Sequence, residues 1–331
     1  GCRLDYIRTM CALMKEAGFD ADIVFASSDA YEAAVLRQAD MYTHPNVAAF
    51  ASPLCRVKVR RGGFLWWGGS TTTYYFGTEN EYSPLGVSAF SGSHFFDPVD
   101  ETFGVVEAAS KELESATEST MTFYVRENGS VDIDYESITY GPLVAGFRKK
   151  YAEMLPENRS RNYQELLGNI SQGATATSEL ETDVTGYPAR LKFSAFVPNF
   201  AIVSDDLITI LVPEFYDQLF PIVGGIRENP IGIGTADPDL TTVKIVFPKG
   251  YTAFEHVPKY YEFVDPTSSG MLFTHECILD TEPDGRASAT IVRRRFKRPY
   301  AFLAPEYSAM LRDWSRIGSS RSGRSVSSRQ Q

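Results

Sequence analysis

The chain opens on residues that could perform thiol chemistry, Gly1-Cys2-Arg3-Leu4-Asp5-Tyr6. Apolar side chains then recur at helical spacing, and they predict a helix with one buried stripe. The stripe comprises Tyr6, Met10, Leu13, Met14 and Ala17. A thiolate at a helix N-terminus is stabilised by the helix dipole and by a neighbouring imidazolium. Thiol catalysis also needs a histidine base and a carboxylate that orients it. Cys2 is therefore a candidate nucleophile.

Helices and strands that would position such a site follow directly. Gly18 stands where a left-handed helix C-cap is expected. The predicted elements after it are a strand at 21–26, a helix at 29–40 and strands at 54–60 and 64–67. Arg61-Gly62-Gly63 predicts the hairpin turn between the last two strands.

These segments resemble the nucleophile, histidine and aspartate segments of transglutaminase-like domains, which have a papain-like fold. The family's Gly-x-Cys-x-Asp-Tyr motif matches Gly1, Asp5 and Tyr6, and Arg3 stands at the cysteine position. The family's Phe-Asn-His segment places Ser52 at the histidine position. Its Leu-Asp-x-Thr segment, which ends a Trp-rich strand, places Gly68 at the aspartate position.

The resemblance therefore implies a degenerate catalytic triad. Arg3 has no nucleophile and stays charged at ordinary pH, Ser52 does not titrate near neutrality, and Gly68 has no side chain. The former cleft would then be lined by Asp5, Trp66 and Trp67. The alternative is an active cysteine hydrolase or acyltransferase that uses Cys2 with a remote histidine. His44 is one such residue in the sequence.

Composition narrows the function classes. The chain has 331 residues and a net charge of −10, which argues against general nucleic-acid binding. Its four cysteines show no CxxC or metal-ligand spacing, so we expect no metal, no cofactor and no disulfide. Cys11 and Cys55 are expected to be small buried hydrophobes. Asp132 and Asp134 share one strand face, where we expect solvent-facing carboxylates.

Pattern changes along the chain predict an α+β fold with three parts. Residues 1–105 are expected to be the C-terminal part of a transglutaminase-like domain. Residues 106–317 alternate as strands, interrupted by a short helical insertion, and are expected to form a mainly antiparallel β-sandwich. Asn128-Gly129 predicts a hairpin turn in this part. The strands expected after it are 130–140, 174–184 and 189–197, and the expected helices are 143–155, 162–170 and 307–314. Residues 318–331 are rich in Ser, Gly and Arg and are expected to be disordered.

We therefore expect a non-catalytic binding or scaffolding module, a pseudoenzyme of the transglutaminase class. Its expected partner is a peptide, a glycan or a cell-envelope protein. The resemblance implies a bacterial, periplasmic or envelope-associated protein of which this sequence is a fragment. A signal region would then lie in the missing N-terminal part. No run of 18 or more apolar residues predicts a transmembrane helix.

Overall fold

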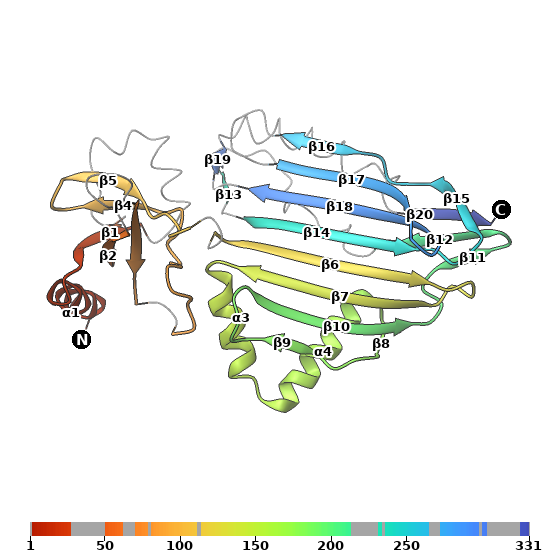
Figure 1. The fold of residues 1–331 in the computed structure, drawn as a ribbon, viewed down its shortest axis with the longest axis horizontal. Coiled ribbons are helices and arrows are strands. Elements are labelled where there is room, and N and C mark those ends of the chain that lie inside the picture. The colour runs from red at the N-terminus through yellow and green to blue at the C-terminus, as the bar shows by residue number, and fades with distance from the viewer. Residues whose placement is uncertain are drawn as a thin grey trace.

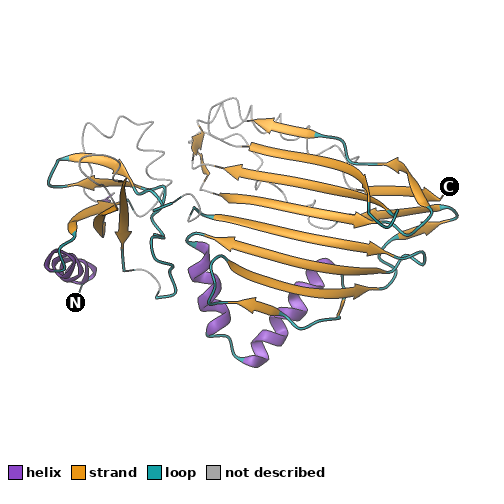
Figure 2. Cartoon of the chain, in the orientation of Figure 1, coloured by secondary structure: helices purple, strands orange, loops and turns teal. Residues whose placement is uncertain are grey.

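The fold was analysed in a computed structural model, which describes most of the chain. The described residues are 2–27, 50–61, 70–78, 81–110, 114–212, 231–233, 236–264, 272–297, 300–302 and 325–330. Within them the protein is mostly β, with helices packed on antiparallel sheets (Figures 1 and 2). The predicted α+β class is confirmed at this level.

The first sheet has five strands in the order β3-β2-β1-β4-β5, all antiparallel to their neighbours. Its elements are α1 (Arg3–Glu16), β1 (Asp20–Ala26), β2 (Ser52–Arg61), β3 (Ser70–Phe76), β4 (His94–Asp97) and β5 (Thr102–Val105). Helix α1 packs on β1 and β2. The helix and β1 are joined by a reversal at Gly18, whose φ of +88° confirms the predicted left-handed cap.

The buried stripe of α1 matches the predicted one only in part. Ile7 and Cys11 face the sheet, and Met10 and Met14 of the predicted stripe pack against the same cluster. Tyr6 and Leu13, also in the predicted stripe, are 59% and 65% exposed. The helix is apolar around much of its circumference, so periodicity could not separate two stripes about 100° apart. Packing against β1 and β2 decides which of these side chains are buried.

The strand that returns beside β2 also differs from the prediction. Ser70, the first residue of β3, pairs with Arg61 of β2. The strand described beside β2 therefore starts after Gly68-Gly69 and not at residue 64 as predicted. The predicted strand at 64–67 and the predicted helix at 29–40 lie outside the described residues. Cys11 and Cys55 are both buried, as predicted.

The second sheet has nine strands in the order β16-β17-β18-β14-β6-β7-β10-β8, with β9 also paired to β10. Their bounds are β6 (Ala116–Val125), β7 (Val131–Tyr140), β8 (Thr175–Ala176), β9 (Glu181–Asp183), β10 (Ala189–Val197), β14 (Ala236–Val246), β16 (Tyr261–Val264), β17 (Leu272–Thr281) and β18 (Ala287–Lys297). All described pairings are antiparallel except that β14 runs parallel to β6 at the centre (Figure 1).

One face of this sheet carries the main hydrophobic core. Strand residues Phe123, Ile133, Phe193 and Ile245 lie on that face and contact both helices and a smaller sheet. The covering elements are α3 (Leu143–Ala152), α4 (Pro156–Ile170) and the strands β11 (Ile202–Ser204), β12 (Leu207–Leu211), β15 (Tyr251–His256) and β20 (Ser325–Gln330). A short pair, β13 (Ile231–Ile233) and β19 (Tyr300–Phe302), completes the strands.

Local predictions in this part are largely confirmed. The Asn128-Gly129 hairpin is present, with Gly129 at φ +79° and the Asn128 side chain accepting from the Ser130 amide at 3.0 Å. The helical insertion lies between β7 and β10, and β10 has its predicted bounds. The strand predicted at 174–184 is instead two short edge strands, β8 and β9.

The predicted disorder of 318–331 is wrong for Ser325–Gln330, which form strand β20. This strand lies between β12 and β15, and Val326 is fully buried against the core. Composition predicted disorder because the segment has few apolar side chains. Two flanking strands supply backbone hydrogen bonds on both sides, and small serines fit between them. Residues 318–324 and the predicted helix at 307–314 lie outside the described residues.

Candidate functional site

Cys2 is the N-cap residue of α1 and is exposed to solvent. Its backbone amide donates to the Asp5 carboxylate at 2.9 Å, and its thiol also bonds this carboxylate. The Cys2 amide, followed by the thiol, holds the pKa of Asp5 below its usual value. Within the described part of the chain, no other side chain makes a polar contact with Cys2. The polar contacts of the Cys2 amide and thiol among the described residues are therefore with a carboxylate and not with a histidine base.

The structure does not bring the described triad positions together. Arg3 is the first residue of α1 and is exposed. Ser52 pairs with Ala26, whose side chain packs on the sheet face opposite the one that α1 covers. Gly68, Trp66 and Trp67 lie outside the described residues.

Three of the four histidines are described. His94 opens β4, and strand alternation places its side chain on the α1 face of the first sheet, together with Phe96. His275 lies in β17 of the second sheet, where burial, and then the charge of Arg293, lowers its pKa to about 4. His256 ends β15, and His44 lies outside the described residues.

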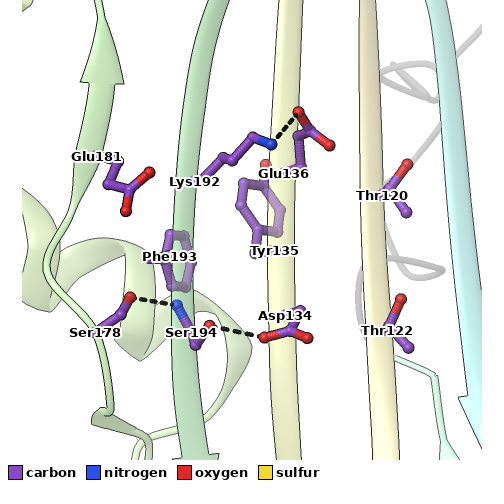
Figure 3. A pocket seen from close by; sticks show the side chains of 10 residues that line it. All are labelled: Thr120, Thr122, Asp134, Tyr135, Glu136, Ser178, Glu181, Lys192, Phe193 and Ser194. Carbon is purple, nitrogen blue, oxygen red and sulfur yellow. Dashed lines mark hydrogen bonds and ion pairs between the residues drawn. The ribbon is translucent and has the colours of Figure 1, made fainter.

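A pocket lined mainly by polar side chains lies on the second sheet. It has a volume of about 320 Å³ and opens on the face opposite the hydrophobic core (Figure 3). Strands β6, β7 and β10 supply alternate polar side chains to its floor, and β9 with the turn before it forms one wall. The polar lining consists of Thr120, Thr122, Asp134, Glu136, Ser178, Glu181, Lys192 and Ser194.

Hydrogen bonds fix part of this lining and leave the rest available. The Ser194 hydroxyl donates to Asp134 at 2.7 Å, and the Ser194 amide donates to the Ser178 hydroxyl at 2.8 Å. Within the described residues the Thr120 and Thr122 hydroxyls make no hydrogen bond. These two hydroxyls and the second oxygen of Asp134 point into the same hollow (Figure 3).

The pocket is net acidic. Lys192 bonds Glu136 at 3.0 Å and Arg190 bonds the same carboxylate at 3.1 Å. Burial raises the pKa of Glu136, but these two cations more than offset it and hold the pKa below its usual value. Asp134 and Glu181 have no cationic partner among the described residues. The surface thus offers hydrogen-bond acceptors and negative charge.

A second hollow of about 420 Å³ adjoins the first and shares Glu181 and Lys192 with it. It continues across β9 toward Asp183 and Arg190. The Asp183 carboxylate is already bonded within the turn that follows β9, where it accepts a hydrogen bond from the Gly186 amide at 2.7 Å. The two hollows form one polar groove along the β9 edge.

Among the described residues no cluster of three His, Cys, Asp or Glu side chains is placed to hold a metal ion. Asp132 instead pairs with Arg126 at 2.7 Å on the open sheet face. No helix in the described ranges combines the length and apolar character needed to cross a membrane.

Sequence reasoning found only part of this groove. The alternation of β7 correctly predicted that Asp132 and Asp134 share a polar face. It could not predict that β10 pairs with β7 and brings Lys192 and Ser194 beside them. The matching alternation of β10 was the signal that could have suggested it.

Comparisons of this chain with protein-family models, with curated proteins and with solved structures found no match.

Proposed function

We propose that this chain is a non-catalytic, transglutaminase-like binding module, and that its ligand binds in the polar groove of the second sheet. The observation that carries the proposal is a hollow of about 320 Å³ lined by uncommitted hydroxyls and carboxylates. This volume is at the lower end of the range for small-molecule pockets, about 300–1,000 Å³. The groove replaces the former cleft as the proposed binding site.

The non-catalytic part of the proposal is supported by the surroundings of Cys2. Its contacts are with the Asp5 carboxylate, and Ser52 packs on the far face of the sheet from α1. A thiolate nucleophile needs a nearby positive charge or imidazole. The α1–β1–β2 arrangement is compatible with the nucleophile segment of the family that the sequence resembles.

The chemistry of the groove favours a ligand rich in hydrogen-bond donors. Thr120, Thr122 and Asp134 present acceptor oxygens within one hollow, and Glu181 adds negative charge at its wall. A sugar with several hydroxyls and an amino group would satisfy both features, whereas an anionic sugar would meet like charge. We therefore assign the ligand to neutral or amino sugars.

Calorimetric titration with the glucosamine disaccharide, its N-acetylated form and a digalacturonate tests this assignment. The first two should bind and the third should not. Asp134→Asn should weaken binding of the amino sugar by about tenfold or more, because it removes a charge-assisted hydrogen bond. Asp280→Asn is the matched control, since Asp280 lies on β17 of the same sheet outside the groove. Equal affinity of the two variants, or no heat from either sugar, would overturn the proposal.

A cysteine hydrolase remains the second candidate because Cys2 is exposed at a helix N-terminus and His94 lies on the α1 face of the sheet. Labelling of Cys2 with iodoacetamide at neutral pH separates the two. A rate equal to that of a free thiol supports the binding module. A much faster rate that falls in His94→Ala would establish an activated nucleophile.

A further inference from the structure

Two thiols meet where α1 packs on the first sheet. Cys11 lies on the helix and is 4% exposed, and Cys55 lies on β2 and is fully buried. Both belong to one apolar cluster with Ile7, Ala21 and Val57. Within this cluster the two thiols lie close enough to interact with each other. The fold thus joins two cysteines that are far apart in the sequence and carry no CxxC spacing.

The surroundings of the pair make it unreactive once the protein is folded. Burial, followed by the neighbouring Cys11, raises the pKa of the Cys55 thiol to about 12. Thiol–disulfide exchange requires a thiolate and access of the attacking sulfur. Neither an oxidant nor a reductant in solution would therefore react readily with the closed cluster. Any covalent chemistry here must take place while the chain is folding.

We propose that Cys11 and Cys55 form a structural disulfide that joins α1 to β2 when the chain folds in the presence of a small-molecule disulfide such as oxidised glutathione. One thiolate attacks the glutathione disulfide, forms a mixed disulfide and releases one reduced glutathione. The second thiolate attacks the protein sulfur of that mixed disulfide, closes the Cys11–Cys55 bond and releases the second glutathione. The two cysteines lose two protons and two electrons, and the oxidised glutathione accepts the electrons.

The other two cysteines are not part of this pair. Cys2 is exposed at the start of α1, and Cys277 lies on β17 of the second sheet. The packing of α1 against β2 holds the two paired side chains on facing elements, and the bond then fixes the helix to the sheet. Cross-linking two distant positions removes entropy from the unfolded chain, so the oxidised protein is expected to be more stable. The inference does not depend on the proposed ligand.

The test uses the full chain with Cys2→Ser and Cys277→Ser, which leaves the pair as the only thiols. This protein is unfolded and refolded with a mixture of oxidised and reduced glutathione, and its intact mass is measured. We expect a mass lower by about 2 Da, no thiol titratable in denaturant, and a crosslinked peptide joining the two cysteines. The melting temperature should rise by at least about 5 °C relative to the reduced protein.

The matched control carries Cys55→Ala in addition, and circular dichroism establishes that it folds. It should show no loss of mass and no rise in melting temperature after the same treatment. Cys11→Ala in the same background gives a second control from the opposite side of the pair. An unchanged mass, or a gain of glutathione on each thiol without closure, would overturn the proposal. A crosslink that dithiothreitol reduces rapidly in the folded protein would also contradict it, because the pair would then be accessible.

Discussion

Replacing Arg56 by methionine should strongly destabilise the first sheet. Arg56 is buried on β2 and donates to Asp22 at 2.7 and 2.5 Å and to Asp97 at 2.5 Å. Its guanidinium also lies over the Phe95 ring, 5.6 Å from the centroid. Methionine keeps the apolar stem and removes the charge. The carboxylate of Asp97, only 1% exposed, would then be left without its cation.

The size of the effect follows from what remains around the two carboxylates. Asp97 keeps hydrogen bonds from the amides of Val99 and Asp100 at 2.9 and 3.3 Å. Asp22 is partly exposed and has Lys58 at 4.0 Å. Removing one member of a buried ion pair costs about 3–5 kcal/mol. Because these contacts still stabilise the two carboxylates in part, we expect a loss at the lower end of this range. Arg56→Met should lower the free energy of unfolding by about 3 kcal/mol.

A second arginine provides a control that differs in burial and in binding one carboxylate instead of two. Arg126 donates to Asp132 through two nitrogens, both at 2.8 Å, and lies 5.2 Å from the Phe196 ring centroid. Both partners of this pair are exposed. Exposed ion pairs contribute about 0–1 kcal/mol. Arg126→Met should therefore cost less than about 1 kcal/mol despite its similar geometry.

Urea unfolding at pH 7, followed by circular dichroism and by hydrogen exchange in β1 and β2, measures both variants. With a typical urea dependence, Arg56→Met should lower the midpoint for the first sheet by about 1–2 M. The loss of unfolding free energy caused by Arg56→Met should become smaller as the pH is lowered. Burial raises the pKa of Asp97, but the Val99 amide and Arg56 more than offset it, so the folded pKa is depressed. That stabilisation is present above the unfolded pKa and is lost as pH falls through the folded value. Equal costs for the two variants would refute the reasoning.

Three further outcomes are expected. The folded pKa of His275, lowered to about 4 by burial and by Arg293, lies below the unfolded value. Stability should therefore fall by about 2–3 kcal/mol between pH 6.5 and pH 4, and His275→Gln should remove that part of a urea-unfolding pH profile. Val326→Asp should lower the melting temperature by more than about 5 °C, and an unchanged value would contradict a buried β20. Ile7→Ala should lower the free energy of unfolding in urea by about 2–5 kcal/mol, and Tyr6→Ala should lower it by less than about 1 kcal/mol. If Tyr6 were buried and Ile7 exposed, as the stripe predicted from the sequence implies, the two losses would be reversed.

Much of the local structure could be predicted because its causes are local. The cap at Gly18 and the hairpin at Asn128-Gly129 depend on backbone conformations that these residues adopt easily. The alternation of β7 and β10 gave their bounds to within a residue. Pro156 at the start of α4 suits the first turn of a helix, although the predicted start was later.

Predictions were wrong where contact with a neighbouring helix or strand determines the local structure. The apolar side chains of α1 cover two neighbouring stripes, and contact with β1 and β2 buries Ile7 and Cys11 rather than Tyr6 and Leu13. The composition of Ser325–Gln330 suggested disorder, and pairing with β12 and β15 made it a strand. Alternation within β7 says nothing about whether β10 lies beside it, because that pairing depends on residues far away in the chain.

The sequence by itself determined the α+β class, the turns and the alternation of polar and apolar side chains, since these follow from each residue's own conformational and solvation preferences. The tertiary structure alone decided that Asp134, Ser194 and Thr122 share one groove, and that Cys11 meets Cys55. The physical reason is that burial of the apolar strand faces selects one set of partners and one register. That selection is a property of the whole core rather than of any segment.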